Sequence, residues 1–294
     1  MDLSIRCDRL AGPGETVIAH DARELPGGKG ANQAVAAARL GARVAMVGRV
    51  GSDAFADRLL ANLEAEGLDV TCVRRTGGCA SGLAIVAVDR GGENAITAVP
   101  GANGRVSPAD VEAAADAIRE ADVLLLQLEI PLETVQAATR MARDAGTLVI
   151  LDPAPAPAHV PEALLEVDVI CPNALEAAAL LGRARVSVAE AMDVARTLAS
   201  RGPGTVIVTL GRDGAVCCDR RGRGERVPAP TVRVVDTTAA GDAFAAALGV
   251  RLAERAPLAE AVRFACHAGA VAASRPGAQP AMPTREDIDG LTGC

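Results

Sequence analysis

From about Arg43 onward, short apolar runs alternate with segments whose apolar residues recur at helical spacing. Continuous apolar runs of this length are typical of strands that are buried on both faces. They predict strands at 43–48, 122–129, 147–153, 167–172, 205–211 and 231–236. The helical spacing predicts helices at 54–66, 108–120, 132–145, 173–181 and 187–200. Such alternation indicates an α/β sandwich in which helices cover both faces of a parallel sheet.

Local signals mark where helices begin and where the alternation of strands and helices is interrupted. Ser107 before Pro108 is an N-cap followed by a first-turn proline, and Ser187 with Glu190 forms a capping-box pattern. Residues 14–25 are mostly polar and extended, and residues 82–99 read as a hairpin that turns at 89–92. These two segments predict a small separate sheet made from insertions.

Composition limits the class of protein. The 294 residues are 50% hydrophobic, enough for one large core, and the net charge of −7 includes no basic block. A nucleic-acid or anionic-membrane surface is therefore not expected. The longest apolar stretches, such as 121–128, fall short of the roughly 20 residues that span a bilayer. We expect no export signal, and eight cysteines without a CxxC pair indicate free thiols in a reducing cytoplasm.

The segment 27-GGKGANQAVAAARLGA-42 places glycines and a lysine before an alanine-rich helix. Glycine lets a backbone approach a ligand closely, and a helix N-terminus offers unpaired N–H groups to oxygen-rich ligands. Asn32 and Gln33 add donors and acceptors in the first turn. A tight turn with an ordinary helix start explains the same letters. The segment lacks the GK[ST] of a Walker loop and the G-x-G-x-x-G of a dinucleotide site.

The segment 234-VVDTTAAGDAF-244 leads from a predicted strand through small residues into an apolar helix. Ala239, Ala240 and Gly241 would present backbone N–H groups to a phosphoryl group at the helix start. Asp242 then lies in the first turn. It either interacts favourably with the helix dipole or acts as a general base that takes a hydroxyl proton.

Three further stretches follow predicted strands or a predicted helix. In 171-CPNALEAAALLG-182, Asn173 and Glu176 form either a capping box or an outer shell around Mg²⁺ and phosphate. The stretch 209-TLGRDGAV-216 is a glycine turn after a strand, and 275-RPGAQPAMP-283 is a loop after a helix at 257–273. Each of these stretches has an ordinary structural explanation when taken alone.

Together, GGKGANQA, DTTAAGDAF and GAQPAMP resemble the ribokinase-type, or phosphofructokinase-B, carbohydrate kinase family. The first two signatures stand about 200 residues apart in the family's order, and the resemblance covers nearly the whole chain. It implies a single domain over 1–294, a three-layer α/β/α sandwich with a mostly parallel central sheet and a small β-sheet lid. The lid would comprise about 12–26 and 80–100, and paired lids would form a homodimer. The implied reaction is ATP-dependent phosphorylation of the 5-hydroxyl of D-ribose.

The resemblance also implies roles for particular residues. Asp242 would be the base, beside an anion hole of Ala239, Ala240 and Gly241. The sugar would be held by Asp2, Gly28, Lys29, Gly30, Asn32 and Glu129. ATP would contact Asn173, Thr209, Gly211, Gly214, Gly241 and Cys266, with Glu176 acting through water and Mg²⁺. An activating monovalent cation, K⁺, would lie among Asp236, Thr238, Ala272, Arg275 and Gly277.

The chain departs from the family pattern at two places. Ala281 stands where relatives often have a serine near the cation, which weakens the expectation of potassium activation. The family begins with a β-strand and G-S-x-N-x-D, whereas this chain starts at the residue before that Asp. We therefore expect a misassigned start and roughly ten residues upstream, from a strand of about 5–6 residues plus the rest of the motif.

Other functions remain open from the sequence. The same chemistry could act on deoxyribose, adenosine or fructose, since specificity depends on pocket shape and a few hydrogen bonds. A catalytically silent sugar-binding protein is the alternative from another class, because the first strand and a sugar-contacting Asn are missing from the motif.

Overall fold

A computed structural model describes residues 1–91, 94–157 and 161–292, and its larger sheet has six strands in the order β12-β11-β10-β9-β8-β7. Strands β7 to β10 are parallel, and β11 and β12 add an antiparallel hairpin at one edge. The predicted α/β class with a mostly parallel sheet is confirmed. The strands are β7 (Val123–Leu126), β8 (Leu148–Leu151), β9 (Val169–Ile170), β10 (Thr205–Thr209), β11 (Ala215–Asp219) and β12 (Gly224–Val227).

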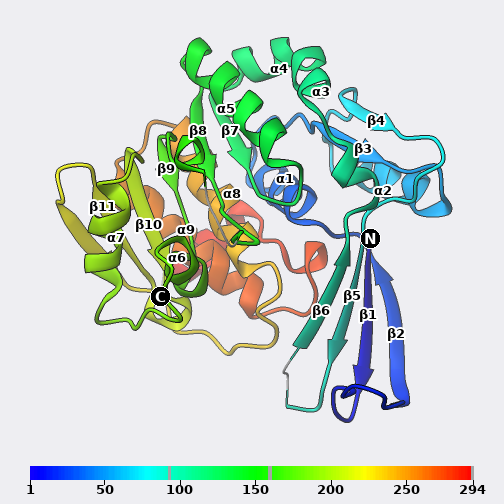
Figure 1. Ribbon diagram of the computed structural model, residues 1–294. Coiled ribbons are helices and arrows are strands. Elements are labelled where there is room, and N and C mark those ends of the chain that lie inside the picture. The colour runs from blue at the N-terminus through cyan, green and yellow to red at the C-terminus, as the bar shows by residue number, and fades with distance from the viewer. Residues whose placement is uncertain (92–93, 158–160, 293–294) are drawn as a thin grey trace.

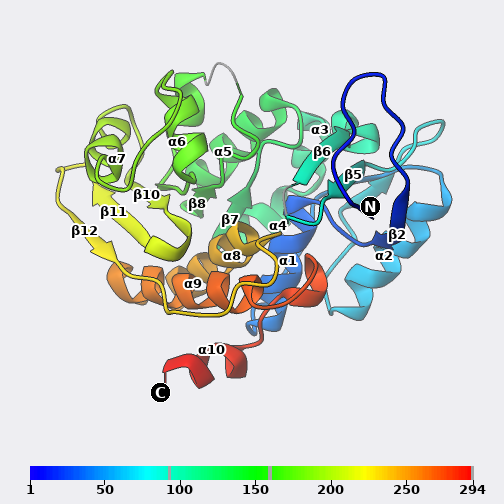
Figure 2. The same cartoon turned by 90° about the horizontal axis from the view of Figure 1, so that it is seen from below.

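Alternate residues of these strands face two separate hydrophobic cores, because successive strand side chains point to opposite faces. Ile150 and Ile207 belong to one core, whereas their neighbours Val149 and Val206 belong to the other. Helices pack on both faces, as Figures 1 and 2 show. One face is covered by α1 (Lys29–Arg39), α8 (Ala240–Ala253) and α9 (Leu258–Ala273). The other is covered by α3 (Pro108–Ala113), α4 (Ala115–Glu120), α5 (Leu132–Ala145), α6 (Ala174–Leu180) and α7 (Ala191–Ala199).

The predicted helices occur with changes at their ends. The segment 108–120 is divided at Ala114 into α3 and α4. Ser107 caps α3 as predicted, and it does so in a capping box that it forms with Asp110. Ser187 and Glu190 do form hydrogen bonds with each other, yet α7 begins only after them. The remaining helices are α2 (Ala54–Ala65) and α10 (Arg285–Thr292).

Two strand predictions are wrong. In 43–48, Ala45 forms only an isolated bridge with Asp69, and regular pairing starts at β3 (Gly48–Val50) with β4 (Val73–Arg75). The segment 231–236 is irregular chain, tied to α9 where the N–H groups of Val235 and Asp236 donate to the carbonyl of Ala273. Apolar, β-branched residues made both segments look like strands, but a strand requires a neighbouring ladder.

A second sheet of four strands, the small sheet, projects from the body (Figure 1). Its order is β2 (Ala19–Leu25), β1 (Asp2–Cys7), β5 (Leu83–Val88), β6 (Asn94–Val99). Strands β5 and β6 pair antiparallel, while residues 92–93 of the expected turn lie outside the described residues. Strand β1, which the sequence analysis assigned to no element, pairs with both β2 and β5. It carries Asp2 to the junction with the body.

No helix in the described ranges is both long and apolar enough to cross a membrane. The seven cysteines in these ranges are free thiols, five of them buried, and Cys294 lies outside them. This agrees with the expectation of free thiols.

Two glycines of the β10–β12 region provide a matched test of local packing. Both have a positive φ, +85° at Gly214 and +76° at Gly222, which strains a residue that carries a Cβ. A Cβ at Gly214 would lie 2.0 Å from the Val227 carbonyl oxygen, whereas at Gly222 nothing lies within 4 Å. We expect Gly222→Ala to cost about 1–2 kcal/mol from backbone strain. Gly214→Ala should cost about 1–3 kcal/mol more from overpacking. Equal losses in denaturant unfolding would contradict this packing.

Candidate active site

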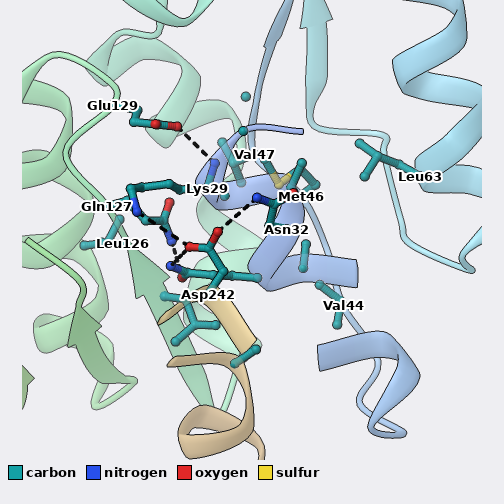
Figure 3. Close-up of a pocket in the computed structure, with 18 of the residues that line it drawn as sticks. Lys29, Asn32, Val44, Met46, Val47, Leu63, Leu126, Gln127, Glu129 and Asp242 are labelled. Atoms are coloured by element: carbon teal, nitrogen blue, oxygen red, sulfur yellow. Dashed lines mark hydrogen bonds and ion pairs between the residues drawn. The ribbon is translucent and has the colours of Figure 1, made fainter. Parts of the chain in front are cut away.

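Asp242 lies in the first turn of α8, and its side chain is only 3% exposed. Asn32 Nδ2 donates to Asp242 Oδ2 at 2.9 Å, and Gln33 Nε2 donates to Oδ1 at 3.2 Å. Both donors belong to α1, about 210 positions earlier in the chain. Figure 3 shows the carboxylate facing α1 across the pocket. The Asp242 carboxylate is therefore held by side chains of α1, and a favourable interaction with the dipole of its own helix does not explain these bonds.

The N-terminus of α1 packs closely against Asp2 and other neighbouring segments. Gly28 precedes the helix with φ 95°, and a Cβ at Gly27 would lie 2.0 Å from the Asp2 carboxylate. The Lys29 N–H donates to Glu129 Oε2 at 3.0 Å, and Lys29 Nζ lies 3.9 Å from Asp242 Oδ1. The turn thus gathers side chains from the small sheet, the loop after β7 and α8.

Five carboxyl groups gather here around two ammonium groups: Lys29 interacts with Glu129, Asp152, Glu176 and Asp242, and the Met1 N-terminus interacts with Asp2 and Glu129. Burial raises the pKa of Asp2, Glu129, Asp152, Glu176 and Asp242 above their usual values. Burial works against the charged form of Lys29, but the surrounding carboxylates outweigh it, so the pKa of Lys29 is raised. At Asp242, Lys29, Asn32 and Gln33 oppose the effect of burial. The excess of acidic groups makes the site attractive to cations.

The structure adds Gln33 and Asp152 to the residues that the sequence analysis assigned to the site. Gln33 Nε2 also donates to Asp152 Oδ2 at 2.8 Å, and its Oε1 accepts from Gln127 Nε2 at 2.5 Å. Gln33 therefore links Asp242 to two side chains that follow β7 and β8. The sequence did carry a signal, because Asp152 lies at the carboxyl end of the parallel strand predicted at 147–153, where ligand sites gather.

A cavity of about 1380 Å³ brings together the predicted base and the predicted sugar-binding residues. Asn32 Oδ1 is buried and, among the described residues, has no hydrogen-bond partner. It is a free acceptor for a ligand hydroxyl. The lining includes Asp2, Gly28, Lys29, Gly30, Asn32, Glu129, Ala239 and Asp242.

At the predicted anion hole, α8 begins at Ala240 after Ala239 in left-handed conformation, φ 57°. The Ala240 N–H donates to the Thr237 carbonyl at 3.3 Å. By helix geometry, the N–H groups of the first turn, including that of Gly241, have no partner within α8.

The predicted nucleotide residues lie apart from the lining of that cavity. Asn173 and Glu176 form a complete capping box at the start of α6, and Asn173 bridges to Thr209. The box uses Asn173 Oδ1 and Glu176 Oε2. Gly211 and Gly214 flank the turn after β10, and Cys266 is buried in α9, where burial raises its pKa to about 12.

The two loops that carry the predicted cation residues are joined by a hydrogen bond from the Gly277 N–H to Asp236. Asp236 accepts from the N–H of Thr238 and of Gly277, both at 2.9 Å. Burial raises the pKa of Asp236, but these bonds outweigh it and leave the pKa below its usual value. The Arg275 N–H donates to the Ala272 carbonyl, while its guanidinium pairs with Asp287. Within the described ranges, no three His, Cys, Asp or Glu side chains could hold a metal ion by themselves.

Comparison with known proteins gives a consistent picture. Residues 1–285 match the sequence model of the pfkB family of carbohydrate kinases. The chain is 38% identical to a ribokinase of Haemophilus influenzae, over 94% of this chain and 90% of that protein. It is 37% identical to a ribokinase of Bacillus subtilis, with 99% and 96% covered. The solved structure of Arabidopsis thaliana ribokinase with ribose and ATP superposes with a TM-score of 0.88 at 32% identity, covering 99% of this chain and 95% of that one.

The raised pKa of the buried Asp152 carboxyl predicts how the free energy of unfolding depends on pH. Because its pKa is raised on folding, the unfolded chain ionises first, and the free energy of unfolding falls as pH rises above the usual Asp value. Asp152→Asn keeps an acceptor for Gln33 without this penalty. We expect its midpoint of thermal unfolding to exceed that of the wild type by a few degrees at pH 7, with little gain at pH 4. For chains of roughly 200 residues, about 1 kcal/mol corresponds to ~2–4 °C. A gain independent of pH would contradict the assignment.

Proposed function

The chain belongs to the pfkB family of carbohydrate kinases, and from this we propose that it phosphorylates the primary 5-hydroxyl of D-ribose with ATP. The observation that carries the proposal is the buried Asp242 carboxylate, held by Asn32 and Gln33 and facing Lys29 in the cavity. The names of the two bacterial relatives and of the Arabidopsis structure support ribose as the acceptor.

Asp242 acts as the general base in this proposal. It takes the proton of the sugar hydroxyl as the hydroxyl oxygen bonds to the γ-phosphorus, while the bond from that phosphorus to the bridging oxygen of ADP breaks. The N–H groups of Ala239, Ala240 and Gly241 stabilise the transferring phosphoryl group, and Ala240 gives up its 3.3 Å bond to the Thr237 carbonyl to do so. Because the pKa of Asp242 is raised, it is a stronger base than an ordinary aspartate.

Ribose is held by the polar groups that line the cavity. The free Asn32 Oδ1 accepts a sugar hydroxyl, and the raised pKa of Lys29 keeps its ammonium group a donor. Asp2, Gly28, Gly30 and Glu129 complete this set. A ring of hydrogen-bonding groups discriminates strongly against analogues that lack the matching hydroxyl.

ATP is bound by Asn173, Thr209, Gly211, Gly214, Gly241 and Cys266 in this proposal, with Mg²⁺ as its companion ion. The acidic surroundings fit Mg²⁺, which binds through phosphates and retains waters. Glu176 acts on Mg²⁺ through water, with Oε1 available because Oε2 accepts from the Asn173 N–H in the capping box. Mg²⁺ neutralises charge on the phosphates, and the protein's residues position them.

A monovalent cation, K⁺, lies in our proposal among the carbonyls and side chains of Asp236, Thr238, Ala272, Arg275 and Gly277. The hydrogen bond from the Gly277 N–H to Asp236, which joins their two loops, supports this placement. ADP release in potassium chloride, compared with choline chloride, tests the activation. The free thiols support a cytoplasmic location.

Replacing the base is the direct test. Asp242→Asn should lower kcat by about 10²–10⁴-fold, the usual contribution of a general base. Ribose binding, measured by calorimetry, should remain, because Asn keeps an acceptor for Gln33. The wild-type kcat/KM should fall on the acid side with a midpoint above the ordinary Asp pKa, because Asp242 must be ionised and its pKa is raised.

The panel of acceptors separates the alternatives. ADP release is measured with ribose, deoxyribose, adenosine and fructose. If another acceptor gives a higher kcat/KM, that acceptor replaces ribose as the proposed substrate. If ribose binds but no acceptor is turned over, the chain is a silent sugar-binding protein. Normal turnover by Asp242→Asn would refute the base assignment.

The small sheet serves in this proposal as a lid that excludes water, and two lids pair in a homodimer. The support is a pair of exposed apolar side chains on one face of this sheet, Ile85 (36%) and Val99 (51%), whereas Ile96 lies on the opposite face and lines the cavity. We expect Ile85→Lys to shift the mass measured by light scattering toward the monomer. Val188→Lys, at a similarly exposed site (39%) on another segment, is the matched control. A monomeric wild type would refute the dimer.

A further inference from the structure

Two amide side chains in series connect the loop after β7 with the Asp242 carboxylate. Gln127, the residue that directly follows β7, donates from Nε2 to Gln33 Oε1 at 2.5 Å. Gln33 in turn donates from its own Nε2 to Asp242 Oδ1 at 3.2 Å and to Asp152 Oδ2 at 2.8 Å. Figure 3 shows Gln127 in the same pocket as Asp242. The hydrogen-bonded path from Gln127 to the proposed base therefore runs through Gln33.

The two ends of the Gln33 amide are not interchangeable in this network. An amide nitrogen can only donate hydrogen bonds, and an amide oxygen can only accept them. With Nε2 between two carboxyl groups, Gln33 donates to both, whereas a flipped amide would place Oε1 against Asp242 and lose that bond. The Gln33 side chain is 1% exposed, so water does not replace a bond that is lost. The orientation of this amide decides whether Asp242 keeps its second donor.

Asp152 alone does not fix the orientation of the Gln33 amide. Burial raises the pKa of Asp152 well above its usual value, and a protonated carboxyl can donate as well as accept. A protonated Asp152 could therefore pair with either end of the amide. Gln127 removes this ambiguity, because its Nε2 group is a donor and pairs only with the oxygen of Gln33.

Gln127 is itself held firmly. The residues on either side of it are hydrogen-bonded through their backbones to the chain at 152–154, at 2.8 and 3.0 Å. Its side chain lies against α1, where a Cβ at Gly30 would be 3.1 Å from Gln127 Oε1. Glycine at this position leaves room for the amide to reach Gln33. The fixed backbone and the close contact with α1 make Gln127 a rigid support for that amide.

We propose that Gln127 is a positioning residue for phosphoryl transfer, because its bond to Gln33 fixes the amide that holds the Asp242 carboxylate toward the acceptor hydroxyl. Gln127 acts through Gln33 and is not itself a catalytic residue. This inference rests on the proposed function, in which Asp242 takes the proton of that hydroxyl. Without the bond from Gln33, the carboxylate loses one of the two amide donors that hold it in place.

The charged groups around Asp242 set the direction of the expected pH effect. Burial raises the pKa of Asp242, whereas Lys29 and the two amide side chains of α1 act to lower it. Loss of the bond from Gln33 therefore raises this pKa further, and ionised Asp242 forms only at a higher pH. The other charged groups of the site lie on separate elements and stay unchanged in the variants below: Asp2, Glu129, Asp152 and Glu176.

A double-mutant cycle tests the inference. Its variants are Gln127→Met, Gln33→Met and both together, since Met keeps a similar length but has no N–H to donate. Gln127→Met should lower kcat about tenfold through misplacement of the base, and it should leave ribose binding, measured by calorimetry, unchanged. The acid-side midpoint of kcat/KM should move to higher pH. Gln136→Met, the same change on α5 outside the cavity lining, is the matched control.

The double variant distinguishes action through Gln33 from a direct role of Gln127. In the Gln33→Met background, adding Gln127→Met should change kcat by no more than about twofold, because the two residues act as one unit. A full further loss in that background would show that Gln127 acts directly and would overturn the inference. A loss confined to ribose binding would assign Gln127 to the sugar and overturn it as well.

A measurement without substrate separates this inference from the proposed function. Carboxyl ¹³C NMR of the free protein follows the titration of Asp242, whose signal is identified by its absence from the spectrum of Asp242→Asn. We expect Asp242 to titrate at higher pH in Gln127→Met than in the wild type and in Gln136→Met. An unchanged titration in Gln127→Met overturns the role of Gln127 alone, whereas normal turnover by Asp242→Asn refutes the base itself.

Discussion

The packing of α1 against α8 is the contact on which the site depends. These helices lie about 200 residues apart in the chain, and their first turns meet at Asp242, Asn32 and Gln33. The approach is close because both helices bury small residues, with Ala34, Ala36 and Ala37 in α1 and a run of alanines in α8. A high alanine content, which composition alone leaves unexplained, thus allows two helix N-termini to share one carboxylate.

The site also depends on the direction of the sheet. Gln127, Asp152 and Asn173 follow β7, β8 and β9, and parallel strands place such residues at one edge. Burying several carboxyl groups together is unfavourable, and their raised pKa values record that cost. Lys29 offsets part of it within the protein. The remaining negative charge is the kind of field that a nucleotide's metal ion or a sugar's hydroxyl donors relieve.

Periodicity and motifs predicted what depends on local sequence. The parallel strands from 122–129 to 205–211 and most helices were recognised, because buried strands and amphipathic helices differ in spacing. The segments 43–48 and 231–236 were not correctly predicted, because their composition does not report whether a partner strand lies beside them. Strand β1 was missed although its residues DLSIRC alternate between polar and apolar, because six residues do not report the pairing with β2 and β5. Gln33 and Asp152 could be named as polar, but their link to Asp242 exists only through tertiary packing.

The precision of the sugar site depends on how firmly α1 is held. α1 packs against α8, and its first residue is tied to the loop after β7 by the bond from the Lys29 N–H to Glu129. Farther along the helix, Ala37 lines the same cavity. Because catalytic groups must be held within about 0.5 Å of their productive geometry, the contacts that fix α1 bear on turnover as well as on stability.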